Sequence, residues 1–418
     1  MRWDFSDIEN RNELIIHGTA RLDWAQRHMP VLEALGREIA ERGAIRGMKI
    51  AMALHTEAKT GVLARKLSAA GANIRLASCN PLSTDDRVAA ALQTEGIEVK
   101  ARKGIGRDDY YSALNWTLDM EPDIIIDDGG DLVRLLHTER TELLHNILGG
   151  CEETTTGVIR LRAMQKDGRL KFPVMDVNDC AMKHLFDNRF GTGQSTLDGI
   201  LNATNLTIAG MRITVCGYGW CGRGIASRLK GMGANVTVSE VDPVRAVEAA
   251  MDGFNVQSLE LSAPSANMII TATGCKHVVS SEVIDNLPDG CLLANSGHFD
   301  NEIDVGYLRT LPSFAAREHV TGYHLGEKTL FLLSEGRLVN LAAGQGHPVE
   351  IMDMSFAIQA AGVEIIALKG RELPPEVIPF PVELDQRIAR LKLTSMNYST
   401  STLTEDQKKY LESWTEGT

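Results

Sequence analysis

The feature that most constrains the fold is a repeated alternation of short apolar runs with stretches of helical periodicity. In the first part of the chain the apolar runs are KIAMAL (49–54), NIRLAS (73–78), EVKAR (98–102) and DIIID (123–127). In the second part they are GMRITVCGYG (210–219), NVTVSE (235–240), NMIITATG (267–274) and GCLLANSG (290–297). Such alternation is typical of parallel sheets covered by helices on both faces. The sequence therefore predicts an α/β protein with two doubly wound, Rossmann-like sheets.

The C-terminal part follows a different pattern. PVEIMDMSFAIQAAGVEIIALKG (348–370) predicts one long apolar-rich helix, and PP (374–375) and PFP (379–381) then interrupt the chain. LDQRIARLKLTSM (384–396) predicts an amphipathic helix. Because such a helix needs a surface to pack on, we expect residues 381–418 to form a small extension that contacts a neighbouring subunit.

Composition narrows the function classes. The net charge of −12 makes nucleic acid an unsuitable partner. No apolar run approaches the roughly 18–20 residues that span a membrane, and MRWDFSDIEN has acids where a signal peptide needs an apolar core. The seven cysteines include no pair at CxxC spacing, so we predict no metal site and reduced thiols in the cytoplasm.

The turn CGYGWCGRG carries the GxGxxG pattern at Gly217, Gly219 and Gly222, between a predicted strand and a predicted helix. Glycines at these places let a dinucleotide pyrophosphate approach the helix N-terminus. Glu240 ends the next strand, where a carboxylate binds ribose hydroxyls and repels a 2′-phosphate. The sequence thus favours NAD over NADP. The alternative is a turn that only packs the helix on the strand.

Other polar clusters also follow apolar runs. DDGGD (127–131) lies where ligands bind in open sheets, although a solvated turn has the same composition. EETTTG (152–157) combines carboxylates with hydroxyls, which also suit a helix N-terminus. NSGHFD (295–300) contains His298, and GRLVNLAAGQGHP (336–348) contains Asn340 and His347. A single histidine is more often structural than functional, but two in glycine-flanked turns favour a site.

The segment NDCAMKHLFDNRFGTGQS (178–195) places Lys183 and Asp187 four residues apart, on one helix face. A surface ion pair is the ordinary explanation of such spacing. Asn188, Gly191 and Gly193 are expected to end this helix and to form a hinge between domains.

With LHTEAKTG (54–61) and SCNPLSTDD (78–86), these segments resemble the adenosylhomocysteinase family, in one order along nearly the whole chain. The resemblance implies cleavage of an S-nucleosylhomocysteine to a nucleoside and homocysteine. It implies one tightly bound NAD per subunit, which oxidises the 3′-hydroxyl. The acidified 4′ proton then leaves, homocysteine departs by β-elimination, water adds, and the ketone is reduced. Domain closure would exclude water during these steps.

The resemblance also implies roles for individual residues. The implied catalytic residues are His55 and Asp128 near carbons 4′ and 5′, Lys183 and Asp187 at the 3′-hydroxyl, and His298. The implied substrate-binding residues are Glu57, Lys59, Thr60, Asp128, Glu153, Lys183, Asp187 and His347. The implied cofactor-binding residues are Thr154, Thr155, Thr156, Asn188, Gly217, Gly219, Gly222, Glu240, Gly297, His298, Asn340 and His347. A lysine that removes a hydroxyl proton is expected to have a lowered pKa.

The implied domains are a substrate-binding domain over 1–184 with a returning segment at 346–380, an NAD-binding domain over 190–345, and a dimerisation extension over 381–418. Tetramers are usual in the family, so a homotetramer or homodimer is expected. Many members end in a basic, tyrosine-containing tail that reaches a neighbour's NAD. This chain ends in YLESWTEGT and departs from that pattern, with Lys408, Lys409 and Tyr410 as the nearest substitutes.

A second departure concerns the nucleoside base. The commoner family pattern has a threonine at the place of Glu57 and a glutamate, which accepts from the adenine amino group, at the place of Lys59. An ammonium donates but cannot accept. Lys59 could donate to the 6-oxo group of hypoxanthine while Glu57 accepts from the ring N–H. We therefore favour S-inosylhomocysteine as substrate, with S-adenosylhomocysteine as the alternative if Lys59 pairs with Glu57 or marks a subgroup.

Two other classes share part of this pattern. A net oxidoreductase, such as a 2-hydroxy-acid dehydrogenase, would need the glycine turn and a histidine but not the Lys183–Asp187 pair. A non-catalytic NAD-sensing protein would be expected to lose site residues, yet His55, Asp128, Lys183 and Asp187 are all present.

Overall fold

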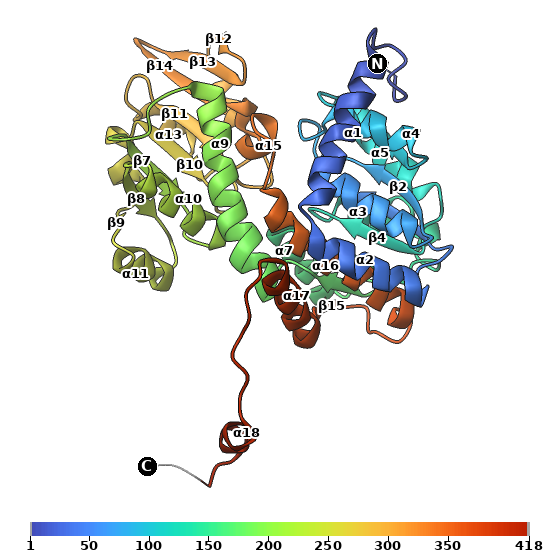
Figure 1. The fold of residues 1–418 in the computed structure, drawn as a ribbon. Helices are drawn as coiled ribbons and strands as arrows, with labels where there is room; N and C mark the ends of the chain where they lie inside the picture. Colours follow the sequence, from blue (N-terminus) through green and yellow to red (C-terminus); the bar gives the residue numbers. More distant parts are fainter. Residues whose placement is uncertain (1, 416–418) are drawn as a thin grey trace.

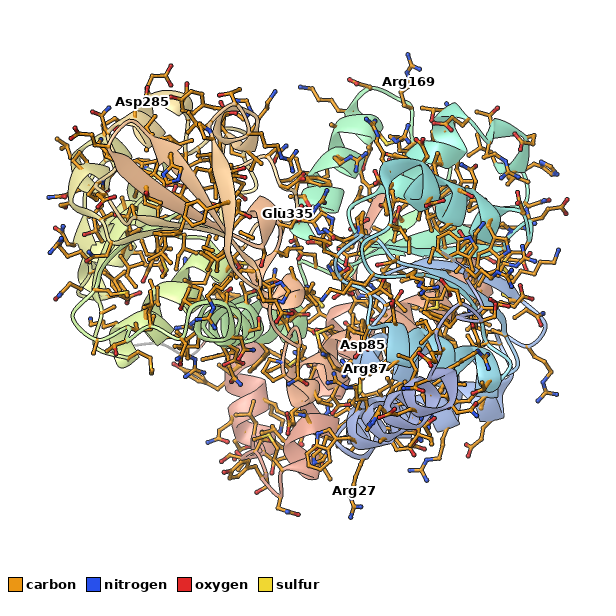
Figure 2. All side chains as sticks on the ribbon, turned by 90° about the horizontal axis from the view of Figure 1, so that it is seen from above. Arg27, Asp85, Arg87, Arg169, Asp285 and Glu335 are labelled. Carbon is orange, nitrogen blue, oxygen red and sulfur yellow. The ribbon has the colours of Figure 1, made fainter. Side chains whose placement is uncertain are left out.

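The computed structural model describes residues 2–415 and places them in two lobes, with the C-terminal end extending away (Figure 1). One sheet organises each lobe, and both sheets are mainly parallel. The predicted α/β fold with two doubly wound sheets is confirmed. Figure 2, seen from above, shows Asp285 on one lobe and Arg27 and Arg169 on the other.

The first sheet has seven parallel strands in the order β15-β6-β5-β4-β1-β2-β3. From β1 the chain first adds β2 and β3 on one side of the sheet and then adds β4, β5 and β6 on the other side. The strand order therefore reverses between β1 and β4, which is where open sheets bind ligands. The strands are β1 (Lys49–Ala53), β2 (Asn73–Ala77), β3 (Glu98–Lys100), β4 (Ile124–Asp127), β5 (Gly149–Glu152), β6 (Val174–Asp176) and β15 (Val377–Pro379).

Helices cover both faces of this sheet. They are α1 (Arg11–Arg27), α2 (Pro30–Arg42), α3 (Ala58–Ala69), α4 (Asp86–Thr94), α5 (Arg107–Leu118), α6 (Asp131–Thr138) and α7 (Thr155–Lys166). The sequence pattern missed β5, β6 and β15, because strands of only three or four residues are too short to show a clear pattern. In β5, Gly149 and Gly150 have no room for a side chain: a Cβ would lie 2.7 Å from the Pro173 oxygen and 2.6 Å from Ile125 respectively.

The second sheet has eight strands in the order β12-β13-β14-β11-β10-β7-β8-β9. They are β7 (Arg212–Cys216), β8 (Asn235–Ser239), β9 (Asn255–Val256), β10 (Met268–Thr271), β11 (Leu292–Asn295), β12 (Ser313–Arg317), β13 (Val320–Leu325) and β14 (Lys328–Leu333). At one side of this sheet, β13 pairs antiparallel with both β12 and β14, which the sequence pattern did not predict, and β14 pairs in parallel with β11. The helices are α9 (Thr192–Thr204), α10 (Trp220–Gly231), α11 (Pro243–Met251), α12 (Leu259–Ser262), α13 (Ser281–Asp285), α14 (Val305–Leu308) and α15 (Val339–Ala342).

The helix that was expected to end near Asn188 continues. The short α8 (Ala181–Lys183) leads into a π-helical segment, His184–Gly191, and then directly into α9. The predicted helix end is wrong, because the glycines allow close packing within a continuous helical segment, and the hinge stays a prediction. A Cβ on Gly191 would lie 2.8 Å from the ring of His347, and one on Gly193 would lie 2.6 Å from the Gly224 backbone.

The helix α16 (Val349–Lys369) returns from the second lobe to the first. By length and composition alone this helix could cross a membrane, since its mean hydropathy is 1.6. The expectation that no apolar run is long enough to do so is therefore wrong for this segment. However, 72% of that stretch is buried inside the protein, where α16 packs against α2, α3 and the π-helical segment. It is therefore a core helix that joins the two lobes.

The helix α17 (Val382–Ser395) packs on α16, α2 and α8 of its own chain, so it needs no neighbouring subunit to cover it. Asp385 fixes its first turn by accepting from the backbone N–H groups of Ala181 and Met182, both at 3.0 Å. Beyond it, residues 396–415 are exposed along their whole length and include α18 (Glu405–Glu412). The contact of residues 381–418 with a neighbouring subunit stays a prediction.

Candidate active site

A cavity of about 700 Å³ lies where the carboxyl ends of both sheets face each other. It is lined by almost every residue that the sequence assigned to a site: His55, Glu57, Lys59, Thr60, Asp128, Glu153, Thr154, Thr155, Thr156, Lys183, Asp187, Asn188, Gly217, Gly219, Glu240, Gly297, His298, Asn340 and His347. Gly222 lies outside the lining. A Cβ there would be 1.9 Å from the Gly217 oxygen, so its role is to pack α10 against the turn.

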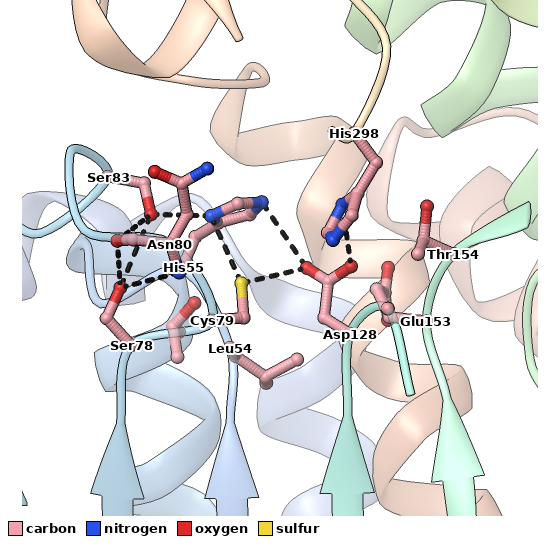
Figure 3. Close-up of polar contacts among 12 residues, drawn as sticks. Leu54, His55, Ser78, Cys79, Asn80, Ser83, Asp128, Glu153, Thr154 and His298 are labelled. Carbon is pink, nitrogen blue, oxygen red and sulfur yellow. Dashed lines mark hydrogen bonds and ion pairs between the residues drawn. The ribbon is translucent and has the colours of Figure 1, made fainter. Parts of the chain in front are cut away.

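Asp128 stands between two histidines (Figure 3). Its Oδ2 lies 3.4 Å from His55 Nε2, and its Oδ1 lies 3.5 Å from His298 Nδ1. His55 and Asp128 follow β1 and β4 of the first lobe, whereas His298 follows β11 of the second. The donor atoms of the three lie within 4.8 Å of one another, a spacing that also suits a metal ion and that the scattered sequence positions did not suggest.

The glycines of DDGGD make this approach possible. Gly129 has φ +103°, and a Cβ on it would lie 2.4 Å from His298 Nε2. Asp127 accepts from the backbone N–H groups of Asp128 and Val133, at 3.1 and 3.0 Å, and so holds the turn onto α6. The cluster is therefore both a tight turn and part of the site, with Asp127 in the first role and Asp128 in the second.

Glu152 holds the turn after β4 in place, a role that was not predicted from the sequence. It is fully buried, and its Oε1 accepts from the N–H groups of Gly129 and Thr154, at 2.8 and 3.0 Å. Burial and the nearby Asp127 and Asp128 raise the pKa of Glu152 well above its usual value. EETTTG thus supplies a structural acid, then Glu153 at the cavity, then Thr154 as the N-cap position of α7.

Lys183 lies in a cage of polar groups and not on the surface. Its Nζ lies 3.2 Å from Asp187 Oδ2, 3.3 Å from Glu153 Oε1 and 2.8 Å from Asn188 Oδ1. The side chain of Lys183 is 6% exposed and that of Asp187 is 2% exposed. His347 adds a contact of 2.7 Å between its Nδ1 and Asp187 Oδ1. The explanation by a solvated ion pair is excluded by this burial.

The charge state of Lys183 differs from expectation. Burial works to lower the pKa of Lys183, but Asp187, Glu153 and Asp128 outweigh it and raise that pKa above its usual value. Burial works to raise the pKa of Asp187, but Lys183 and His347 hold it below its usual range. Burial raises the pKa of Glu153 to about 7 against the opposing effect of Lys183. Lys183 is therefore an ammonium, and the predicted lowering is wrong because three carboxylates surround it.

Two residues of α16 complete this cage. Neither was predicted as a site residue, and only their spacing of four residues could have indicated them. Ser355 donates to Asp187 Oδ2 at 2.6 Å, and Gln359 donates to Glu153 Oε2 at 2.6 Å. Both side chains are fully buried. A polar pair on one face of an otherwise apolar helix was the available clue, because buried polar groups need partners.

Lys59 and Glu57 also line the cavity, and they pair with each other at 2.6 Å. Lys59 Nζ also donates to the backbone oxygen of Gln345 at 2.7 Å, which joins the two lobes. The Glu57 carboxylate caps α3 by accepting from the backbone N–H groups of Lys59 and Thr60. The carboxylate is thus largely occupied, whereas the ammonium keeps one of its three protons free.

The turn after β7 fits a dinucleotide. Gly217 has φ +95°, and Gly219 is the N-cap position of α10 with no side chain to cap it, which leaves the first N–H groups of the helix for an anion. Glu240 accepts from the Tyr218 N–H at 2.6 Å and faces the cavity. Two buried cavity atoms, Thr156 Oγ1 and Asn340 Oδ1, have no hydrogen-bond partner among residues 2–415. Such orphaned groups suit a polar ligand that fills the cavity.

Comparison with known proteins agrees with this geometry. The model of the S-adenosyl-L-homocysteine hydrolase family matches residues 7–144, and the model of its NAD binding domain matches residues 188–346. An S-inosyl-L-homocysteine hydrolase of Methanocaldococcus jannaschii is 56% identical over 96% of this chain and 97% of that protein. An adenosylhomocysteinase of Thermoplasma volcanium is 54% identical over 96% and 99%.

Similarity to solved structures is weaker. An NAD-bound 3-phosphoglycerate dehydrogenase of Entamoeba histolytica matches at 13% identity and a TM-score of 0.41, over 78% of this chain and 96% of that one, which carries no functional argument. The sequence relatives and the NAD-binding model show an enzyme with NAD as cofactor. On this similarity along nearly its whole length, and with the expected motifs gathered at one cavity, the chain belongs to the S-adenosyl-L-homocysteine hydrolase family.

Proposed function

We propose that the protein reversibly hydrolyses the thioether of an S-nucleosyl-L-homocysteine, with S-inosyl-L-homocysteine preferred. The observation that carries this proposal is the joining of two proton-handling clusters, one around Lys183 and one around His55, to a dinucleotide turn in one cavity. A direct hydrolysis would need no dinucleotide, and a simple dehydrogenation would need no second cluster.

Bound NAD supplies the acceptor and later the donor of the hydride at carbon 3′. Lys183 as an ammonium donates to the 3′ oxygen and stabilises the negative charge that develops there. The pKa of Glu153 is about 7, so its carboxylate is the neighbouring base best suited to take the hydroxyl proton. Asp187 stays ionised and keeps Lys183 in place.

His55 handles the proton at carbon 4′. Burial lowers the pKa of His55 to about 4, against the opposing effect of Asp128, so the ring is neutral at neutral pH. A neutral imidazole can accept the 4′ proton once the adjacent carbon is a ketone. Asp128, 3.4 Å from Nε2, then stabilises the imidazolium. The same pair returns the proton after homocysteine has left and water has added.

Lys59 supports the preference for the inosyl base. Its ammonium has one proton beyond its contacts with Glu57 and Gln345, and this proton can bind a 6-oxo group but not a 6-amino group. Glu57 contributes less than the sequence suggested, because its oxygens already accept from Lys59 and the α3 backbone. The names of the relatives do not select a base, since the inosyl and adenosyl enzymes are 56% and 54% identical to this chain.

The experiment is thiol release from S-inosyl- and S-adenosyl-L-homocysteine, supplied separately at equal concentration to the NAD-loaded protein. Faster release from the inosyl compound supports the base assignment, and faster release from the adenosyl compound overturns it while leaving the reaction type intact. Release from neither compound overturns the reaction type. Net accumulation of reduced nicotinamide with a 2-hydroxy acid would instead support the dehydrogenase alternative, which the family match does not favour.

The remaining expectations complete the proposal. The active form is a homotetramer or homodimer in the cytoplasm, with one tightly bound NAD per subunit. The exposed segment 396–415 is the part of the chain that supports association. The lobes correspond to domains over 1–184 with 346–380, and over 190–345. Light scattering of the intact chain and of a chain ending at residue 395 would test the role of the segment.

A further inference from the structure

The loop after β2 carries a hydrogen-bonded network that reaches the side of His55 away from Asp128 (Figure 3). Ser83 Oγ lies 2.6 Å from His55 Nδ1. Ser83 also donates to the backbone oxygen of Asn80 at 3.1 Å, and Ser78 donates to the same oxygen at 2.8 Å. Ser78 and Ser83 are both buried, at 2% and 5% exposed. In these contacts the hydroxyl of Ser83 touches the imidazole of His55, and the hydroxyl of Ser78 does not.

Because His55 is neutral, it carries one ring proton, and the contacts of its two nitrogens differ. The 2.6 Å contact at Nδ1 is a short hydrogen bond, whereas the 3.4 Å contact between Nε2 and Asp128 is longer than a normal N–H···O bond. Ser83 has the Asn80 oxygen as an acceptor for its own proton, so its oxygen is free to accept from Nδ1–H. These contacts allow the ring proton to lie on Nδ1 and to be donated to Ser83 Oγ.

Cys79 agrees with this arrangement. Its Sγ lies 3.5 Å from Asp128 Oδ2 and 3.2 Å from His55 Nδ1. Burial, with smaller effects from Asp128 and Asp127, raises the pKa of Cys79 well above its usual value, so the thiol keeps its proton. The thiol can donate a hydrogen bond to Asp128, so Nδ1 of His55 keeps Ser83 as its hydrogen-bond partner.

We infer that Ser83 is a positioning residue that holds His55 in the tautomer with Nε2 unprotonated and facing Asp128 and the cavity. This inference rests on the proposed function, because it matters only if His55 acts as the base at carbon 4′. Nε2 then receives the proton from carbon 4′, the bonding electrons of that C–H bond pass into the carbon framework, and Nδ1–H remains bound to Ser83. The resulting imidazolium lies between Ser83 and Asp128.

The test separates two partial reactions in the NAD-loaded protein, with inosine as the probe and no homocysteine. Formation of reduced nicotinamide reports 3′ oxidation at Lys183, and deuterium uptake at carbon 4′ from heavy water reports proton removal at His55. Ser83→Ala should slow deuterium uptake roughly tenfold or more, while 3′ oxidation stays within about twofold of wild type. Ser83→Thr keeps the hydroxyl and should restore most of the uptake.

Ser78→Ala is the matched control. It removes a buried hydroxyl of the same network, including its 3.3 Å contact with Ser83 Oγ, but Ser83 keeps the Asn80 oxygen and its contact with His55. Its uptake should equal that of wild type. Equal slowing by both alanine variants, or no slowing by Ser83→Ala, would overturn the role of Ser83. Nitrogen NMR of histidine-labelled protein gives a direct readout: a proton on Nδ1 of His55 supports the inference, and a proton on Nε2 overturns it. Absence of reduced nicotinamide in the wild type with inosine and with adenosine would instead overturn the proposed function.

Discussion

The two proton-handling clusters of the cavity differ in the charge of their central side chains, which is zero for His55 and positive for Lys183. His55 lies near one carboxylate, Asp128, and near the further basic groups His298, His347 and Lys59, and its pKa is lowered to about 4. Lys183 lies near three carboxylates, and its pKa is raised. Burial disfavours the charged form of both side chains, so the difference comes from their neighbours. One cavity thereby holds a neutral base and a fixed cation side by side.

The largest expected effect is that of Lys183→Met, which removes the fixed cation. Because Glu153 and Asp187 then face each other without a cation, 3′ oxidation should fall about 10³-fold or more. The measurement is formation of reduced nicotinamide with inosine. Lys392→Met is the control, since Lys392 pairs with the buried Asp353 at 3.2 Å outside the cavity. Normal oxidation by Lys183→Met would show that the ammonium has no role in this step.

His55→Asn should separate the two clusters in the opposite sense. Thiol release and deuterium uptake at carbon 4′ should fall about 10²–10⁴-fold, because the base is lost, while 3′ oxidation persists. His137→Asn is a suitable control, because burial also lowers the pKa of His137 but the residue lies away from the cavity lining. Loss of oxidation together with uptake would mean that the clusters do not act independently.

Lys59→Gln tests the selection of the nucleoside base, a role that is proposed for neither Lys183 nor His55. Glutamine offers both a donor and an acceptor, so the ratio of kcat/KM for the inosyl over the adenosyl compound should fall about tenfold. Thiol release with the two compounds measures the ratio. Lys103→Gln is the control, since Lys103 also contacts the second lobe, through the Ala342 oxygen at 3.5 Å, but does not line the cavity. An unchanged ratio would remove Lys59 from base selection.

The smallest effect concerns the pH dependence. The pKa of Glu153 is raised to about 7, so its carboxylate is lost as the pH falls through 7, and 3′ oxidation should slow below that pH. His55 stays neutral down to about pH 4, so it does not set this limit. Gln359→Leu removes a donor to Glu153, raises the pKa of that acid further and should move the acid limb upward by about one pH unit. Ser262→Ala, a buried serine outside the lining, should leave the limb in place.

Much of the fold could be predicted because long buried strands leave a plain pattern. KIAMAL, NIRLAS and DIIID form β1, β2 and β4, and the glycine turn follows β7 as expected. The short strands β5 and β6 and the antiparallel strands β12, β13 and β14 left no such pattern. The glycines after Asn188 looked like a helix end, because the sequence does not show that Gly193 must fit against the backbone of Gly224.

The sequence by itself determined which chemical groups are available and in what order. The motifs and the NAD preference follow from side-chain types and spacing, and the reaction class follows from the family resemblance that those motifs carry. Only the tertiary structure decided their charge states and partners. Ser355 and Gln359 meet Asp187 and Glu153 because α16 returns across the first lobe, at sequence separations of 168 and 206 residues. The pKa of a buried group depends on the charges within a few ångströms, and that distance is set by packing, not by position along the chain.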